Sequence, residues 1–152
     1  MSECFYTGEF SSSMDSIHQA LDESLEALAR EGWCSDNNCF CVRLCLEEAL
    51  VNAIEHGNGN NPDGTVRIDI LEDGDFCRIR IKDEGHGFDP AKLKMPDCEQ
   101  LGGRGVCLIK EYMDEVHFDA EEGYLEMGFH RDSVCKEGPN DNANESNAIA
   151  DL

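Results

Sequence analysis

The chain has 152 residues, of which 33 are acidic and only 12 are basic, and its formal net charge is −21. This charge repels nucleic acids and anionic membranes, and it favours solubility and contact with basic protein surfaces. The length fits one domain in which roughly two-thirds of the surface can be buried, so we expect no second catalytic domain and no DNA binding.

The cysteines and the start of the chain bear on location. There are nine cysteines, an odd number, and the first ten residues have neither the basic start nor the apolar core of a signal peptide. We therefore expect a protein of the reducing cytoplasm. No apolar run approaches the length that spans a bilayer, so any membrane attachment would depend on a partner.

Residues 4–11 are predicted to form a first strand, and a helix follows it. Ser12, Ser13 or Asp15 is available to cap the start of this helix, and Gly32 is expected to end it. The helix carries aliphatic residues at helical spacing, namely Ile17, Leu21, Leu25 and Leu28.

A second helix is predicted to begin after Ser35 or Asp36 and to stop at residues 56–59, which read His-Gly-Asn-Gly. Its apolar residues include Leu44, Leu46, Leu50 and Ala53. The last three of these should face a sheet, which leaves Glu48 and Asn52 near another edge of the helix.

Four cysteines lie between residues 34 and 45, but their spacing is not the paired Cys-x-x-Cys of a zinc site. Cys41 and Cys45 fall within the two turns that precede Glu48. We interpret them as small buried thiols on this helix rather than as metal ligands.

Two alternating segments, 66–70 and 77–81, are separated by turn residues 72–75 and predict a hairpin whose apolar residues share one face. Residues 88–103 lack a clear period and are expected to form a mobile lid. A helix at 106–113 and a second hairpin, 115–120 with 124–130 around Glu122 and Gly123, complete the domain. The predicted fold is an α/β (α+β) two-layer sandwich with a largely antiparallel mixed sheet and helices on one face.

The domain is expected to span residues 1–132. Residues 133–152 are rich in asparagine and acidic residues and have only three large aliphatic side chains. This composition predicts a disordered tail.

Three short motifs together indicate an ATP site. Glu48 and Asn52 are four residues apart, so on a helix they lie one above the other, where a carboxylate and an amide can share a magnesium-bound phosphate. Asp83 follows a strand and precedes two glycines, which suits the far end of the same nucleotide. The third motif, Gly-Gly-Arg-Gly at 102–105, precedes an apolar helical run, where backbone amides and a helix N-terminus can face a phosphate.

The order Glu-x-x-x-Asn, Asp-x-Gly-x-Gly and Gly-x-Gly resembles the gyrase, histidine-kinase and MutL-type (GHKL) ATP-binding superfamily. Over residues 39–129 the chain more closely resembles the small anti-sigma factor serine/threonine protein kinases. This closer likeness rests on Phe-Asp-Pro at 88–90, Gly-Arg-Gly-Val at 103–106 and Tyr-Met-Asp-Glu-Val at 112–116.

The resemblance implies a role for each motif residue. Glu48 would be the general base that activates the attacking hydroxyl, whereas Glu47 points about 100° away around the helix and would be a solvated carboxylate. Asn52 would hold Mg²⁺ through its amide oxygen. Asp83 would accept a hydrogen bond from the adenine amino group, and Gly85 and Gly87 would let the backbone pass close to the base.

Gly103 and Gly105 would contact the phosphates through their backbone amides. Arg104 lies between them, and it is the basic residue that we expect to compensate the triphosphate charge. It belongs to a group of four among the 12 basic residues, with Lys92, Lys94 and Lys110. For each lysine, a solvated surface position is an equally good interpretation.

The resemblance also implies partners. The protein would phosphorylate a small anti-sigma factor antagonist-like protein and would pair as a homodimer. It would bind a sigma factor when free and release it when an unphosphorylated antagonist competes. The main alternative is a non-catalytic ATP-gated protein-binding module. The detached catalytic domain of a sensor kinase is a weaker alternative, because the neighbours of His18 lack the phospho-acceptor pattern.

Overall fold

The computed structural model describes residues 2–35, 39–54, 63–83, 104–119 and 122–131, and for residues 39 and 104–107 it describes the backbone alone. The predicted lid and tail lie outside these ranges. The elements in chain order are β1 (Glu3–Ser11), the 3₁₀ turn η1 (Met14–Ser16), α1 (Ile17–Arg30), α2 (Cys39–Asn52), β2 (Thr65–Asp73), β3 (Phe76–Lys82), α3 (Arg104–Tyr112), β4 (Glu115–Asp119) and β5 (Tyr124–His130).

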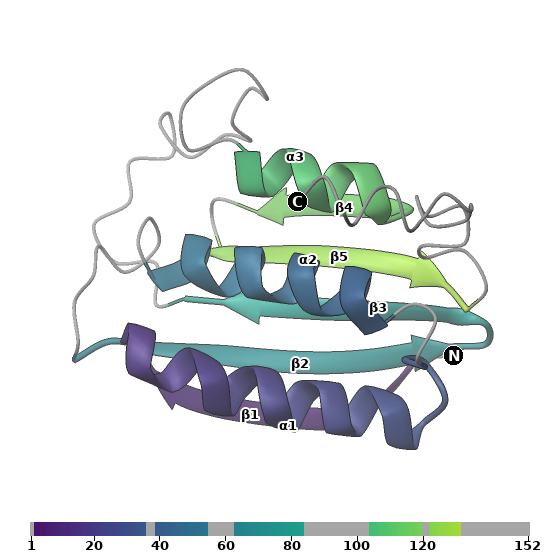
Figure 1. The fold of residues 1–152 in the computed structure, drawn as a ribbon, viewed down its shortest axis with the longest axis horizontal. Coiled ribbons are helices and arrows are strands. Elements are labelled where there is room, and N and C mark those ends of the chain that lie inside the picture. The colour runs from purple at the N-terminus through teal and green to yellow at the C-terminus, as the bar shows by residue number, and fades with distance from the viewer. Residues whose placement is uncertain (1, 36–38, 55–62, 84–103, 120–121, 132–152) are drawn as a thin grey trace, which may run out of the picture.

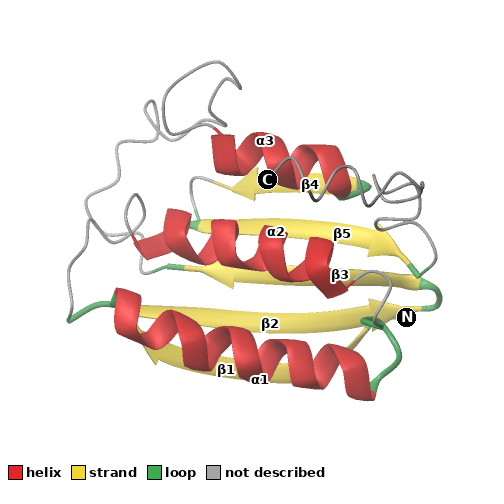
Figure 2. Cartoon of the chain, viewed as in Figure 1, coloured by secondary structure: helices red, strands yellow, loops and turns green. Residues whose placement is uncertain are grey.

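The strands form one five-stranded sheet in the order β1-β2-β3-β5-β4, and every pairing is antiparallel. All three α-helices lie on one face of this sheet, as Figure 1 shows along the chain and Figure 2 shows by element type. The predicted two-layer α+β sandwich is therefore confirmed, with a sheet that is antiparallel throughout the described strands.

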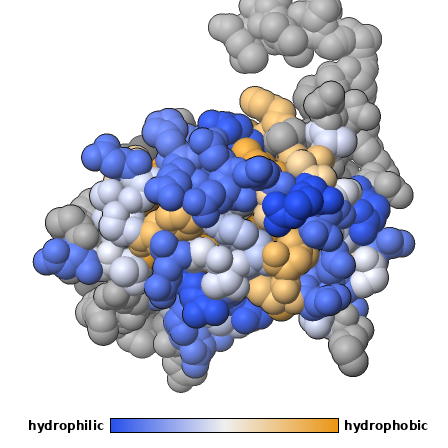
Figure 3. All heavy atoms as spheres, turned by 90° about the horizontal axis from the view of Figure 1, so that it is seen from below, coloured by the Kyte–Doolittle hydropathy of each residue, from blue (hydrophilic) through white to orange (hydrophobic). Residues whose placement is uncertain are grey.

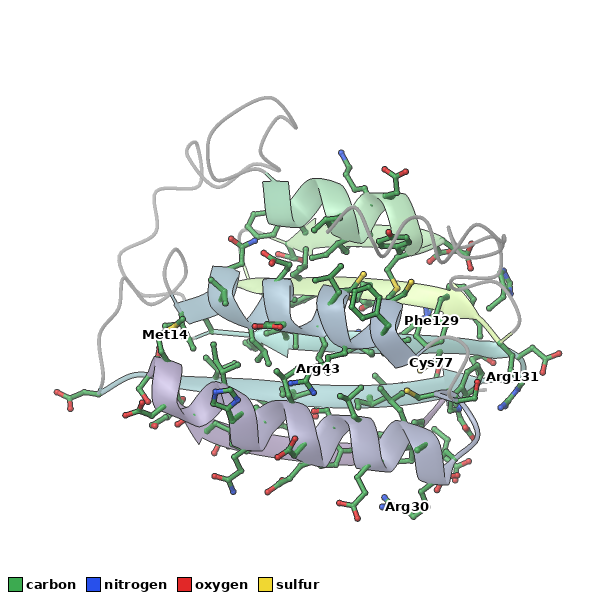
Figure 4. All side chains as sticks on the ribbon, viewed as in Figure 1. Met14, Arg30, Arg43, Cys77, Phe129 and Arg131 are labelled. Carbon is green, nitrogen blue, oxygen red and sulfur yellow. The ribbon has the colours of Figure 1, made fainter. Side chains whose placement is uncertain are left out.

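The core lies between the sheet and the helices. Val66, Ile68 and Ile70 on β2 alternate with polar residues and are at most 1% exposed, because side chains along a strand point to opposite faces. In the register, Ile70 lies opposite Ile79, and Ile79 lies opposite Met127. Further side chains from β3 and β5, including Cys77 and Phe129, extend this apolar layer toward the other end of the sheet (Figure 4).

The helix α1 packs Ile17, Leu21 and Leu28 into the core, as its sequence pattern predicted. Its end is a Schellman motif, in which the N–H of Gly32 donates to the carbonyl of Ala29 and the N–H of Trp33 donates to that of Leu28. Gly32 has a φ of +83°, a conformation that glycine adopts without strain. The prediction that Gly32 ends this helix is confirmed.

None of the three predicted residues is the N-cap of α1 itself, although Ser13 is the N-cap residue of the 3₁₀ turn η1 that leads into this helix, without a side-chain bond to the turn. The N-cap residue is Ser16, and its hydroxyl does not bond to a helix N–H. Instead the hydroxyl oxygens of Ser11 and Ser16 lie 2.7 Å apart and that of Ser13 lies 3.3 Å from Ser16, so the serines bond to one another. Competition between side chains therefore replaces the expected bond to the backbone.

The helix α2 packs against both α1 and α3. Val42, Cys45 and Leu46 are fully buried, and Leu50 and Ala53 are at most 7% exposed, so the predicted sheet-facing residues are confirmed as core residues. The interpretation of two buried thiols holds for Cys45, which is free. It is wrong for Cys41, which is buried but disulfide-bonded, because spacing along a helix does not reveal a pairing partner.

The opposite face of the sheet is charged. Arg80 donates two hydrogen bonds to Glu126 at 2.8 and 3.1 Å, and Arg67 donates to Asp69 on its own strand. Surface ion pairs of this kind contribute little to stability, but they keep this face of the sheet polar.

The outer side of α1 is polar as well. Its exposed residues include His18, Gln19, Asp22 and Glu26. From the side of β1 and α1 the surface is mostly hydrophilic with a few apolar side chains among the polar ones (Figure 3). Among the residues that the structure describes, no helix is long and apolar enough to cross a membrane.

Candidate functional site

The last turns of α2 present the first predicted motif. Glu48 and Asn52 are partly exposed, whereas Ala49 and Leu50 between them are buried against the core. Their spacing of four residues places the two side chains on one face of the helix. The pKa of the Cys45 thiol is raised to about 12. The main cause is burial of the thiol, and the second is the nearby negative charge of the Glu48 carboxylate.

The end of α2 departs from regular α-helical geometry. Ala53 and Ile54 continue the helix beyond Asn52 as a π-helical turn, and both side chains are buried. π-helical turns are frequent at functional sites. The candidate metal ligand Asn52 therefore lies where the α-helix gives way to this wider turn.

Asp83 immediately follows β3 and is partly buried. Its N–H donates a hydrogen bond of 3.0 Å to the carbonyl of Gly123 in the turn between β4 and β5. This bond continues the antiparallel pairing one residue beyond the last strand pair, Lys82 opposite Tyr124. No pattern along the chain predicts this contact, because only the strand order brings residues 83 and 123 together.

The third motif overlaps the start of α3. The helix begins at Arg104, two residues earlier than predicted, so Arg104 and Gly105 belong to its first turn instead of preceding it. The predicted boundary came later because glycine, here Gly105, is unfavourable in helices. Helix boundaries also vary by one or two residues between assignments. Lys110 is exposed on the last turn of the same helix. The predicted residues Gly85, Gly87 and Gly103 lie outside the described residues, as do Lys92 and Lys94.

The elements that carry the three motifs end or begin at the same end of the sandwich. The C-terminal end of α2, the C-terminal end of β3 and the N-terminal end of α3 lie on the same side in Figure 1, and α2 packs directly against α3. The fold thus gathers Glu48, Asn52, Asp83 and the start of α3. The unpaired N–H groups at the start of a helix carry partial positive charge and face toward anions.

The arrangement offers complementary chemistry. A carboxylate can accept a proton, an amide oxygen is a hard ligand of the kind that Mg²⁺ prefers, and a helix N-terminus can face phosphate oxygens. Glu48 and Asn52 are both partly exposed, so ligands can reach them from the end of the sandwich. The residues present therefore fit a magnesium-bound nucleotide.

A model of the histidine kinase-like ATPase domain family matches residues 10–129, which include every described element from the end of β1 to β5. The anti-sigma F factor of Clostridium beijerinckii is 35% identical over 89 residues, which are 54% of this chain and 62% of that protein.

Two further relatives carry the same name. The anti-sigma F factor of Priestia megaterium is 34% identical over 88 residues, which are 52% of this chain and 58% of that protein. That of Bacillus cytotoxicus is 30% identical over 90 residues, 55% of this chain and 61% of that protein. The chain thus spans about 60% of the length of these curated relatives. The resemblance inferred from the motifs is confirmed.

Proposed function

The chain belongs to the histidine kinase-like ATPase domain family, and on this basis we propose that it is an ATP-dependent serine/threonine protein kinase that regulates a sigma factor. One observation carries the proposal. Glu48 and Asn52 lie a single turn apart, partly exposed, at the end of the sandwich where Asp83 leaves β3 (Figure 1). The phosphate acceptor is a small partner that resembles an anti-sigma factor antagonist.

In this proposal Glu48 is the general base. Its carboxylate takes the proton from a serine or threonine hydroxyl of the partner as the hydroxyl oxygen bonds to the γ-phosphorus of ATP. The bond from the γ-phosphorus to the bridging oxygen breaks, and ADP leaves with that oxygen. Phosphoryl transfer depends mainly on positioning and charge stabilisation, so few protein groups are needed.

The nucleotide-binding roles follow from the residue types. Asn52 would hold Mg²⁺, and the ion when bound would offset phosphate charge. Asp83 would accept a hydrogen bond from the adenine amino group. The remaining residues would surround the base and the phosphates and are Gly85, Gly87, Gly103, Arg104 and Gly105.

The partners are inferred from the relatives. Their name, anti-sigma F factor, supports a sigma factor as the regulated protein. That an antagonist is the phosphorylated protein is part of our proposal and follows from the motif resemblance. The net charge of −21 favours partners with basic surfaces. We infer that sigma factor and antagonist compete for a homodimer of this protein in the cytoplasm, where transcription takes place.

The test uses the adjacent glutamates as a matched pair. Wild type, Glu48→Gln and Glu47→Gln are incubated with magnesium and γ-labelled ATP in lysate from the source organism, and labelled proteins are separated by size. Both substitutions remove one carboxylate from α2, and both side chains are partly exposed. We expect a small labelled protein with wild type and with Glu47→Gln but not with Glu48→Gln.

A second measurement separates catalysis from binding. ATP affinity is measured by titration calorimetry for the same three proteins, and Glu48→Gln should bind ATP about as tightly as wild type does. Equal labelling by wild type and Glu48→Gln would contradict the role of Glu48. ATP binding without any wild-type-dependent label would instead favour an ATP-gated binding module without kinase activity.

A further inference from the structure

We propose that the turn between β4 and β5 is a positioning element for adenine recognition, in which Asp119 and Gly123 hold Asp83 in place. This inference rests on the proposed nucleotide site and adds two residues to it. None of the three motifs in the sequence includes either residue.

The backbone of Asp83 is held by this turn. Its N–H donates to the carbonyl of Gly123 at 3.0 Å, immediately beyond the last pair of the β3–β5 ladder. This bond extends the pairing of β3 with β5 by one residue beyond Lys82 and Tyr124. The position of the Asp83 backbone, from which its carboxylate extends, is therefore held in part by the carbonyl of Gly123.

The carbonyl of Gly123 is in turn fixed by Asp119. The N–H of Gly123 donates to the backbone carbonyl of Asp119 at 2.8 Å, and the N–H of Glu122 donates to Asp119 Oδ1 at 2.8 Å. A single residue thus accepts two backbone hydrogen bonds across the turn. A buried Gly123 with a φ of +75° completes the reversal, in a region that other residues enter only with strain.

The ion pair that the described part of the turn makes with β3 is weaker. Lys82 Nζ lies 3.6 Å from Glu122 Oε1, and both side chains are substantially exposed. Exposed pairs of this kind contribute little. Among the described residues of the turn, Asp119 and Gly123 therefore make the stronger contacts, and these two are positioning residues.

Adenine recognition is sensitive to such support. A carboxylate accepts a hydrogen bond from the 6-amino group of adenine but faces the 6-oxo group of hypoxanthine, which offers no donor there. A site built around one hydrogen bond rejects an analogue that lacks it, provided that the acceptor is held in place. The ratio of the dissociation constants of ITP and ATP therefore reports how well Asp83 is positioned, and general instability does not by itself alter this ratio.

The experiment measures this ratio by titration calorimetry, together with the melting temperature, for a set of single variants. Gly123→Ala and Asp119→Ala disturb the turn, and Asp119→Asn keeps the side-chain oxygen that accepts from Glu122. Gly74→Ala is the matched control, because Gly74 also has a positive φ, +64°, in the β2–β3 turn at the other end of the sheet. Asp83→Asn is the reference for loss of the carboxylate.

We expect the ratio to fall at least fivefold for Gly123→Ala and Asp119→Ala, and to stay near the wild-type value for Asp119→Asn. Gly74→Ala should lower the melting temperature without changing the ratio. Wild-type ratios in Gly123→Ala and Asp119→Ala, with a lost preference in Asp83→Asn, would overturn the positioning role and leave the proposed site intact. An unchanged ratio in Asp83→Asn would refute the adenine role of Asp83 and, with it, this inference.

Discussion

The indole N–H of Trp33 donates a hydrogen bond of 2.8 Å to Glu72 Oε1, and it thereby joins the connection after α1 to the end of β2. The indole is 1% exposed, lies edge-on to Phe129 at 6.0 Å, and is covered by the guanidinium of Arg131 at 3.8 Å. Arg131 also donates to the carbonyl of Gly32 at 2.9 Å. This cluster fixes the end of the sandwich opposite the candidate site (Figure 4).

Trp33→Phe should lower the free energy of unfolding by about 1–3 kcal/mol. The substitution removes the indole N–H, a donor that Phe lacks, and leaves a small cavity. Urea unfolding followed by circular dichroism measures this loss, since the chain has a single tryptophan and the variant loses its fluorescence. Glu72→Gln keeps an acceptor oxygen and should cost less. Equal stability of Trp33→Phe and wild type would show that the indole hydrogen bond contributes nothing.

Gly128→Ala should destabilise the sheet by about 1–3 kcal/mol through overpacking. A Cβ at this position would lie 2.5 Å from Phe76 Cε2 and 3.3 Å from the carbonyl oxygen of Cys77. The ring of Phe76 would have to leave its contacts with His130 and Arg78, both at 4.7 Å. Urea unfolding of Gly128→Ala, Phe76→Ala and the double variant checks this, and the double variant should lose clearly less than the sum of the singles.

Local patterns were sufficient where one segment determines its own structure. The alternation of Val66, Ile68 and Ile70 predicted β2 because only one face of that strand is buried. Gly32 predicted the end of α1 because the left-handed residue of a Schellman motif favours glycine. The spacing of Glu48 and Asn52 likewise predicted a shared helix face.

Contacts between distant segments were beyond these patterns. The bond from Asp83 to Gly123 depends on β5 lying between β3 and β4, and a period of two residues does not specify strand order. The contact of Trp33 with Glu72 joins segments 39 residues apart and depends in the same way on how the chain folds. The positioning role that we propose for Asp119 and Gly123 could not be predicted for the same reason.

Stability should fall steeply at alkaline pH because of two buried thiols. Burial raises the pKa of Cys45 and Cys77 from 9.0 to about 12. Above pH 9 the unfolded chain therefore releases these protons while the folded protein retains them, so the free energy of unfolding falls by about 1.4 kcal/mol per pH unit for each thiol until pH 12. The full contribution is present below pH 9.

Urea unfolding of wild type and Cys77→Ala between pH 8 and pH 11 tests this dependence. The two curves of stability against pH should run parallel below pH 9. Above pH 9, wild type should lose about 1.4 kcal/mol more per pH unit than Cys77→Ala does. Parallel curves over the whole range would mean that the thiol of Cys77 titrates alike in both states.

Arg104→Ala should weaken ATP binding by about tenfold, because in the proposed site its guanidinium would add charge-assisted hydrogen bonds to phosphate oxygens. AMP lacks the outer phosphates, so its affinity should change much less. Lys110→Ala is the control: this exposed lysine lies six residues further along α3, about 9 Å from Arg104 along the axis. Calorimetric titrations with both nucleotides measure the difference. Unchanged ATP affinity and turnover in Arg104→Ala would remove the residue from the site.

Asn52→Ala should reduce the gain in ATP affinity that magnesium produces, by about tenfold, and should leave affinity in excess EDTA unchanged. The physical reason is that the amide oxygen at the end of α2 would be a ligand of the ion and not of the base. Asn52→Asp keeps an oxygen ligand and should retain the magnesium dependence. Because Asn52 is partly exposed, neither substitution should change the melting temperature appreciably. If Asn52→Ala and wild type respond alike to magnesium in ATP titrations, the ion is held elsewhere.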